Sequence, residues 1–268
     1  MSDDIYTKLN EGLGGAYERI AYSNVIKRVI AERGCKTILE LGASFIAGIP
    51  GFNSCLLAQA GHDVTVLVHS RDYVDTKHVW ELTGLQANII QCDSYLETPF
   101  SNASFDFVWN HLAFEHYQDP THLVHEMSRV SRDVVMNLTL APYNPGFVIH
   151  YLTHCLQHKF WDHGYIRNST IGAMTRVHRR CGLELLETGG ADVPPWQDTV
   201  DAQLQGSMTY FDAYPKDLRD KWVWSSIDPR CQQHSLVKLF WDMEQTMPKW
   251  FKELVAHHLY AISTVGVK

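Results

Sequence analysis

Residues 37–48 read Thr-Ile-Leu-Glu-Leu-Gly-Ala-Ser-Phe-Ile-Ala-Gly, an apolar strand followed directly by a turn that contains glycine. In doubly wound α/β proteins, a nucleotide-like ligand binds at the carboxyl end of the first strand, beside the N-terminus of a helix. This stretch therefore predicts an α/β fold with a ligand crevice that opens after Leu41.

Short apolar segments alternate with segments of helical spacing from residue 14 to residue 140. Strands are expected at 37–41, 63–68, 87–91, 105–109 and 133–140, and helices at 14–33, 53–60, 72–83 and 120–130. Such alternation is typical of right-handed βαβ units, which build a parallel sheet covered by helices on both faces. Gly34 and Gly61 are expected to end the first two helices.

The second half of the chain is less regular. Helices are expected at 146–160 and 168–181, a sixth strand at 183–188 and a seventh at 257–265. Residues 189–256 form a segment of about seventy residues, far longer than a hairpin needs and rich in aromatic side chains. We therefore expect a doubly wound, mostly parallel seven-stranded sheet. Its core comprises residues 1–188 and the final strand 257–268, with a helical, aromatic-rich cap inserted at 189–256.

The composition excludes several classes of protein. A net charge of −7 disfavours a broad nucleic-acid surface, which needs a basic field. No apolar run reaches the roughly 18–20 residues of a membrane helix, and the acidic start Met1–Asp4 does not resemble a signal peptide. The six cysteines show no paired spacing, which indicates free thiols in a reducing compartment. These features predict a cytoplasmic protein that binds neither membranes nor nucleic acids.

Three places in the sequence resemble class I S-adenosylmethionine (SAM) methyltransferases. They are Glu40-Leu41-Gly42; Asp93, followed by Pro99-Phe100-Ser101 and Ser104–Val108; and Asn110-His111-Leu112-Ala113-Phe114-Glu115-His116. The resemblance covers residues 37–140. It implies a methyltransferase-like Rossmann fold, SAM as the cofactor, and transfer of its methyl group to a small-molecule acceptor.

The resemblance also implies a set of cofactor-binding residues, in which Asp93 would accept a hydrogen bond from the adenine amino group. The set is Glu40, Gly42, Ala43, Ser44, His69, Ser70, Asp93, Ser94 and Asn110. Two features depart from the family pattern. Gly42-Ala43-Ser44 replaces the usual Gly-x-Gly, and the second strand ends in His69-Ser70 where the family has a carboxylate for the ribose hydroxyls. A histidine or serine cannot act as a bidentate anionic acceptor.

These departures leave two alternatives to a SAM-dependent enzyme. One is a one-carbon transferase on the same fold that uses a folate-type or halogenated donor. The other is a non-catalytic ligand-binding protein. The sequence does not identify the acceptor, the atom that is methylated or the oligomeric state.

Candidate acid–base groups follow the fourth and fifth expected strands. An acceptor with an OH, NH or SH group must lose a proton, and a histidine with a pKa near 6.5 is suited to take it. The predicted catalytic residues are His111, His116 and Tyr143, and the predicted substrate pocket contains Glu115, Asn144, His150, His154 and Trp196.

His150, His154 and His158 are spaced four apart and would lie along one stripe of a helix. Metal binding, a position beside the substrate mouth and an ordinary polar surface are all consistent with this spacing. Three ligands in line on one helix make a poor tetrahedron, so we predict no metal from the sequence.

Overall fold

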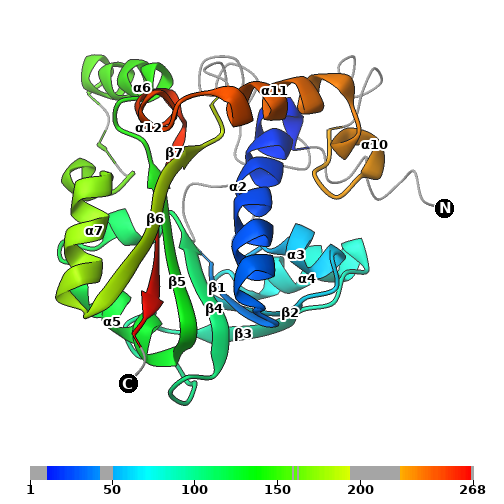
Figure 1. Ribbon diagram of the computed structural model, residues 1–268, viewed down its shortest axis with the longest axis vertical. Helices are drawn as coiled ribbons and strands as arrows, with labels where there is room; N and C mark the ends of the chain where they lie inside the picture. The colour runs from blue at the N-terminus through cyan, green and yellow to red at the C-terminus, as the bar shows by residue number, and fades with distance from the viewer. Residues whose placement is uncertain (1–10, 43–50, 159, 162, 194–223, 267–268) are drawn as a thin grey trace.

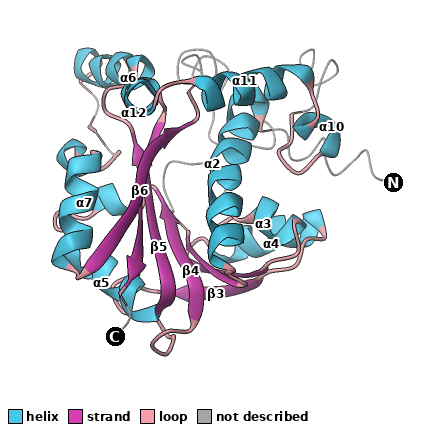
Figure 2. Cartoon of the chain, viewed as in Figure 1, coloured by secondary structure: helices cyan, strands magenta, loops and turns pink. Residues whose placement is uncertain are grey.

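The computed structural model describes residues 11–42, 51–158, 160–161, 163–193 and 224–266. Its centre is a seven-stranded sheet of order β3-β2-β1-β4-β5-β7-β6 (Figures 1 and 2). The strands are β1 (Thr37–Leu41), β2 (Asp63–His69), β3 (Asn88–Cys92), β4 (Phe105–His111), β5 (Ser131–Leu140), β6 (Leu183–Ala191) and β7 (His258–Val265). Neighbours from β3 to β5 are parallel, whereas β7 runs antiparallel to both β5 and β6. The predicted mostly parallel, seven-stranded sheet is confirmed.

Three strands gain residues at their predicted ends, and β3 keeps its length but is shifted by one residue. β2 reaches His69, β4 reaches His111, and β6 continues to Ala191. The first two extensions place predicted site residues on the sheet itself. The third means that the segment predicted as a cap from residue 189 begins after β6 has ended.

Helices cover both faces of the sheet, as the alternating pattern predicts (Figure 1). One face carries α2 (Gly12–Arg33), α3 (Cys55–Gln59) and α4 (Tyr73–Thr83), and the other carries α5 (Thr121–Val130) and α7 (Ile171–Arg180). Successive strand residues point to opposite faces. Ile38 of β1 therefore packs in the core beneath α2, while Leu39 and Leu41 pack in the core beneath α5 and α7.

The end of α2 is set by a glycine. Gly34 adopts a left-handed conformation with φ of +69°, and its N–H donates to the carbonyl of Ile30. A residue without a Cβ takes this conformation at little cost, so the predicted stop at Gly34 is confirmed.

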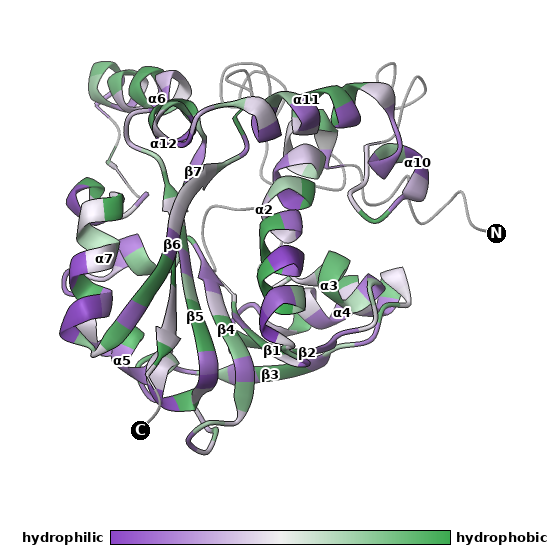
Figure 3. Ribbon diagram, viewed as in Figure 1, coloured by the Kyte–Doolittle hydropathy of each residue, from purple (hydrophilic) through white to green (hydrophobic). Residues whose placement is uncertain are grey.

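The remaining helices lie beyond the end of the sheet at which β7 begins (Figure 1). They are α6 (Pro145–Leu156), α10 (Pro229–Gln232), α11 (Ser235–Thr246) and α12 (Lys249–Val255). The ribbon of α6 has mostly the colour of hydrophobic residues (Figure 3). Ile149 and Leu152 are among the apolar side chains of this helix that remain exposed. In the part of the chain that is described, no helix has the length and apolar character needed to cross a membrane.

α11 is attached to α2 through one buried carboxylate. The hydroxyl of Tyr17 donates to Glu244 Oε2 over 2.8 Å, and the Glu244 carboxylate also accepts from the backbone N–H groups of Asp192 and Val193. One side chain of α11 therefore ties together α2 and the segment that leaves β6.

Two helices of the second half differ from the prediction. The helix expected at 146–160 ends at Leu156, and His158 beyond it has a φ of +52°. The helix expected from 168 begins at Ile171, because Thr170 caps it by accepting a hydrogen bond from the N–H of Ala173.

Candidate functional site

The site is defined by the point at which the strand order reverses. β1 and β4 are neighbours, and the chain winds outward from them in opposite directions. Ligands bind at such a switch point, outside the carboxyl ends of the strands. Leu41 pairs with Asn110 in the register of β1 and β4, so Gly42 and His111 follow side by side at this edge.

Gly42 lies where a side chain could not fit. A Cβ on Gly42 would lie 2.8 Å from the backbone nitrogen of Gly51 and 2.8 Å from the Val68 side chain. The Gly42 N–H donates to the carbonyl of Leu67 over 2.9 Å. The turn after β1 is thus a close backbone approach that requires glycine. The predicted cofactor residues Ala43 and Ser44 lie outside the described residues.

A shallow pocket of about 310 Å³ lies beyond the ends of β2 and β3 and is lined by His69, Ser70, Arg71, Cys92 and Asp93. The hydroxyl of Ser70 donates to Asp93 Oδ1 over 2.9 Å, and Asp93 is exposed. Partial burial lowers the pKa of His69 below its usual value, which favours the neutral imidazole at neutral pH. Three predicted cofactor residues therefore meet in one pocket.

Tyr95 forms part of this region and was not predicted. Its ring lies 4.5 Å from that of His69, and its hydroxyl donates to the carbonyl of Gly42. Tyr95 is buried and connects the turn after β1 to the end of β2. In the sequence, only the position of Tyr95, two residues after Asp93 in the segment that follows the third strand, could have indicated this role.

Two side chains of the pocket offer hydrogen-bonding groups that could contact a nucleoside. The Asp93 carboxylate can accept a hydrogen bond from an amino group, and the neutral imidazole of His69 can make one hydrogen bond to a ribose hydroxyl. In the described residues, no carboxylate occupies the end of β2, so the second ribose contact of the family pattern is missing.

Glu40 and Asn110 bond to the protein backbone. The buried Glu40 carboxylate accepts from the N–H groups of Asn53 and Ser54, at 3.2 and 2.6 Å. Asn110 Oδ1 accepts from the N–H groups of Ala113 and Phe114, both at 3.3 Å. These residues hold the loops after β1 and β4, and direct contact of either with a cofactor stays a prediction.

Ser94 also bonds locally, because its hydroxyl oxygen accepts from the N–H of Leu96 over 3.1 Å. This bond fixes the turn that follows Asp93. A cofactor contact of Ser94 stays a prediction.

His111, the last residue of β4, belongs to a buried group that we call the carboxylate–histidine cluster. The cluster consists of Glu18, His111, Asp192, His257 and His258. Glu18 Oε1 lies 3.1 Å from His111 Nε2 and 3.4 Å from His258 Nε2. His257 Nδ1 lies 3.3 Å from Asp192 Oδ2.

Three elements converge to form this cluster. Glu18 comes from α2, His111 from the end of β4, and His258 from the start of β7. Because β7 is antiparallel, its first residue reaches the same edge as the last residue of β4. The His111 ring stacks between those of Tyr22 and His258, with 5.2 Å between centroids on each side.

The pKa values of the two carboxyl groups in the cluster are shifted in opposite directions. Burial acts to raise the pKa of Glu18, but the neighbouring His258 and His111 outweigh it and hold that pKa below its ordinary value. Burial raises the pKa of Asp192 to about 8, against the opposing effect of His257. Glu18 is therefore the permanent anion of the cluster.

The other predicted acid–base and pocket residues lie elsewhere. Tyr143 is 56% exposed, and Asn144 caps α6 by accepting from the N–H groups of Gly146 and Phe147. His116 lies half-buried at the end of the short helix η1 (Phe114–His116). Among the residues predicted to be catalytic, only His111 joins the cluster. The predicted pocket residue Trp196 lies outside the described residues.

Glu115 is buried with no charged partner shown beside it. Its Oε1 accepts from the N–H of Leu140 over 3.1 Å, and burial raises its pKa to about 8. The carboxyl group is therefore mostly protonated at neutral pH.

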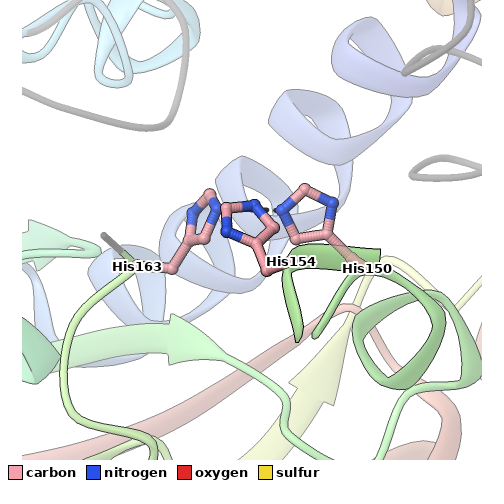
Figure 4. A group of neighbouring side chains, drawn as sticks. All are labelled: His150, His154 and His163. Atoms are coloured by element: carbon pink, nitrogen blue, oxygen red, sulfur yellow. Dashed lines mark hydrogen bonds between the residues drawn. The ribbon is translucent and has the colours of Figure 1, made fainter. Parts of the chain in front are cut away.

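The histidine stripe predicted at 150, 154 and 158 is wrong in its third member. His150 and His154 come together with His163 instead (Figure 4). His158 is exposed, because α6 ends before it and the chain turns there.

Comparisons with known proteins agree with this geometry. Residues 46–134 match a family model described as a methyltransferase domain. No curated protein matches the chain in sequence at a significant level.

Solved structures share the fold. One is a Bacillus halodurans protein described as a methyltransferase, with 15% identity, coverage of 91% of this chain and 98% of that chain, and a TM-score of 0.50. A Haloferax volcanii protein described as a methyltransferase, solved with the Trm112 methyltransferase activator, shows 15% identity, 91% and 89% coverage, and a TM-score of 0.51. A Galdieria sulphuraria protein described as a sarcosine dimethylglycine methyltransferase shows 17% identity, 91% and 83% coverage, and a TM-score of 0.50. These likenesses establish the fold, and the family model places a methyltransferase domain over residues 46–134.

Proposed function

We propose that the chain transfers a methyl group from SAM to a small-molecule acceptor, since it shares the fold of solved methyltransferases and residues 46–134 match a methyltransferase domain. One observation carries this proposal. The switch point places Gly42, in the turn of the cofactor motif, beside His111, the predicted base. Donor and acceptor sides therefore meet between β1 and β4.

The donor side would hold the nucleoside. SAM supplies an electrophilic methyl group on a sulfonium centre when it is bound. Asp93 would accept a hydrogen bond from the adenine amino group, with its orientation set by the Ser70 hydroxyl. His69 would contact a ribose hydroxyl through its neutral ring. Gly42 and Gly51 pack against each other and against Val68, which keeps the backbone after β1 close to the end of β2.

The acceptor side would remove a proton. Glu18 accepts a hydrogen bond from His111 Nε2–H, which leaves His111 Nδ1 as the proton acceptor. In the described residues, Nδ1 has no hydrogen-bond partner. When His111 takes the proton, the Glu18 carboxylate stabilises the resulting imidazolium ion. General-base catalysis of this kind contributes typically ~10²–10⁴-fold to a rate.

A second candidate function is supported by the end of β2. His69 occupies the place where a ribose-binding carboxylate is expected, so a folate-type or halogenated one-carbon donor is the alternative to SAM. The methyltransferase domain favours both candidates over a non-catalytic ligand-binding protein.

Isothermal titration calorimetry with SAM and S-adenosylhomocysteine tests the donor. Micromolar affinity for both compounds supports the SAM-dependent enzyme. If neither compound binds and a folate does, the second candidate function replaces the SAM-dependent enzyme. Mass spectrometry of small molecules that remain bound through purification gives an unbiased check and identifies the chemical class of the acceptor.

The proposed setting of this reaction is the cytoplasm, with small molecules as acceptors. All six cysteines are free in the structure, which suits a reducing compartment. The net charge of −7 disfavours a nucleic-acid acceptor, because phosphate binding needs a basic surface. Methylation assays with neutral or cationic small molecules against RNA test this proposal directly.

A further inference from the structure

His150, His154 and His163 form a group that the proposed methyl transfer does not use, which we call the histidine triad. The first two lie on successive turns of α6, and the third lies in the loop that follows (Figure 4). His150 Nε2 lies 2.9 Å from His163 Nε2, and one ring nitrogen from each of the three residues lies within 4.8 Å of the others.

The three rings are held in place by their surroundings. Trp161 packs against each of them, with ring centroids 5.9, 5.3 and 4.6 Å from those of His150, His154 and His163. The indole N–H of Trp161 donates to the carbonyl of Gly164 over 3.0 Å. The triad is therefore packed as a unit, although its members are only half-buried.

The loop that carries His163 is fixed to the core. Gly164 has a φ of +78°, and a Cβ there would lie 2.7 Å from the carbonyl oxygen of Glu115. The next residue, Tyr165, donates its N–H to that same carbonyl over 2.7 Å. Only glycine permits this approach, so the backbone next to His163 has one defined position.

The hydrogen bonding of His154 selects the nitrogen that it presents. Its Nδ1 lies 3.0 Å from the carbonyl of Phe160, which can only accept, so Nδ1 carries the proton. Nε2 is then unprotonated and available as a ligand. A metal-binding histidine is commonly oriented in this way, by a backbone carbonyl on its other nitrogen.

We propose that the histidine triad binds a divalent transition metal ion of the zinc class, with a fourth position open to water or to an oxygen or sulfur donor. Tetrahedral zinc with bonds of 2.0–2.1 Å to nitrogen places ligand nitrogens about 3.3 Å apart. The 2.9 Å spacing of His150 and His163 is close to this value, and the wider spacings close by a small rotation of half-buried rings. Three imidazoles and an open position suit zinc, copper and nickel.

Titration of untagged, chelator-treated protein with Zn²⁺ against a chromophoric chelator tests the site. Wild type is expected to bind Zn²⁺ at the triad with submicromolar affinity. His163→Ala is expected to lose one equivalent, or to bind it at least about 100-fold more weakly. His158→Ala is the matched control, because His158 is an exposed histidine two residues beyond α6 and belongs to no described cluster.

A change of one equivalent is the readout, because Glu18, His257 and His258 also bring ligand atoms within 4.8 Å of one another. Absence of Zn²⁺ binding by wild type at 100-fold molar excess overturns the proposal, as does equal binding by His163→Ala and His158→Ala. His154→Ala, a replacement on a helix that favours alanine, repeats the test should His163→Ala fail to fold. The d–d spectrum of bound Co²⁺ should report tetrahedral or five-coordinate geometry, and an octahedral spectrum also counts against the triad. None of these measurements involves SAM, so they succeed or fail independently of the proposed function.

Discussion

The carboxylate–histidine cluster and the histidine triad place the same type of side chain, an imidazole, in two different surroundings. The carboxylate–histidine cluster joins His111, His257 and His258 to Glu18 and Asp192. The histidine triad brings three ring nitrogens within 4.8 Å of one another, and a backbone carbonyl orients the His154 ring. A carboxylate partner stabilises imidazolium and favours proton transfer, whereas clustered imidazole nitrogens suit a metal ion.

The largest expected effect concerns the base. His111→Ala should lower kcat/KM for a protonated acceptor by about 10²–10³-fold, because the proton then has no positioned acceptor. Glu18→Gln should cause a smaller loss in the same direction. Steady-state kinetics measure both, with His122→Ala, an exposed histidine of α5, as the control that keeps full activity. Calorimetry should show that the His111→Ala variant binds SAM with unchanged affinity. If this variant keeps the wild-type kcat/KM, His111 is not the base.

The next effect sharpens the contrast through Glu115, a buried carboxyl group for which the described structure shows no ion pair. The folded-state pKa of Glu115, about 8, lies above its ordinary value of 4.5, so the folded protein holds this proton more tightly than the unfolded chain. Wild-type stability should therefore fall as pH rises from 4.5 to 8 and level off above that range. Glu115→Gln, which matches the protonated acid in shape, should lack the part of this fall that Glu115 causes, whereas the part caused by the raised pKa of Asp192 should remain. The variant should be more stable than wild type at pH 8 by a few kcal/mol, on the order that the pKa shift of Glu115 implies.

Urea unfolding at several pH values measures this difference. Glu97→Gln, at an exposed position after β3, is the control and should follow wild type. Parallel curves for Glu115→Gln and wild type would show that Glu115 is ionised in the folded protein.

A smaller effect is expected from Glu18 in acid. Its folded-state pKa lies below the ordinary value, so its contribution to stability is present above pH 4.5 and is lost as pH falls through the folded-state pKa. Glu18→Gln should cost about 1–2 kcal/mol at neutral pH, and the difference from wild type should close in acid. Glu32→Gln, at an exposed position on the same helix, should show neither change in thermal unfolding followed by circular dichroism. A constant difference across pH would mean that Glu18 acts by packing alone.

The smallest effect is expected at the exposed edge of the donor pocket. Asp93→Ala should weaken SAM binding several-fold, because one hydrogen bond to the adenine amino group is lost. Calorimetry measures it, with Glu97→Ala as a nearby control for loss of charge. Unchanged affinity would mean that adenine is recognised elsewhere, and His69→Ala would be the next variant to examine.

The sequence predicted local structure well, since local structure depends on short-range patterns. Strand periodicity and the stop at Gly34 identified the sheet and α2, with errors only at the ends of elements. The sequence also predicted that His69, Ser70 and Asp93 lie near one another, because a parallel sheet gathers its loops at one edge. Their contact with a cofactor stays a prediction.

The sequence could not reveal pairs that meet only through the tertiary fold. Glu18 reads as one polar position of a helix, and its contact with His258 depends on β7 running antiparallel into the same edge. His163 replaced His158 in the histidine triad because α6 ends early, and no proline or glycine near Leu156 marks that end.

Glu244 has one further consequence. The residue that it holds, Tyr17, immediately precedes Glu18 on α2, so a helix 227 positions away in the chain sets where the proposed proton-transfer partner sits. A rotation of α11 that displaced Glu244 would shift Tyr17 and move the Glu18 carboxylate away from the His111 and His258 rings. His111 would then lose the partner that supports it as the proposed base. The position of α11 is thereby coupled, through Tyr17, to the placement of Glu18 in the proposed proton transfer.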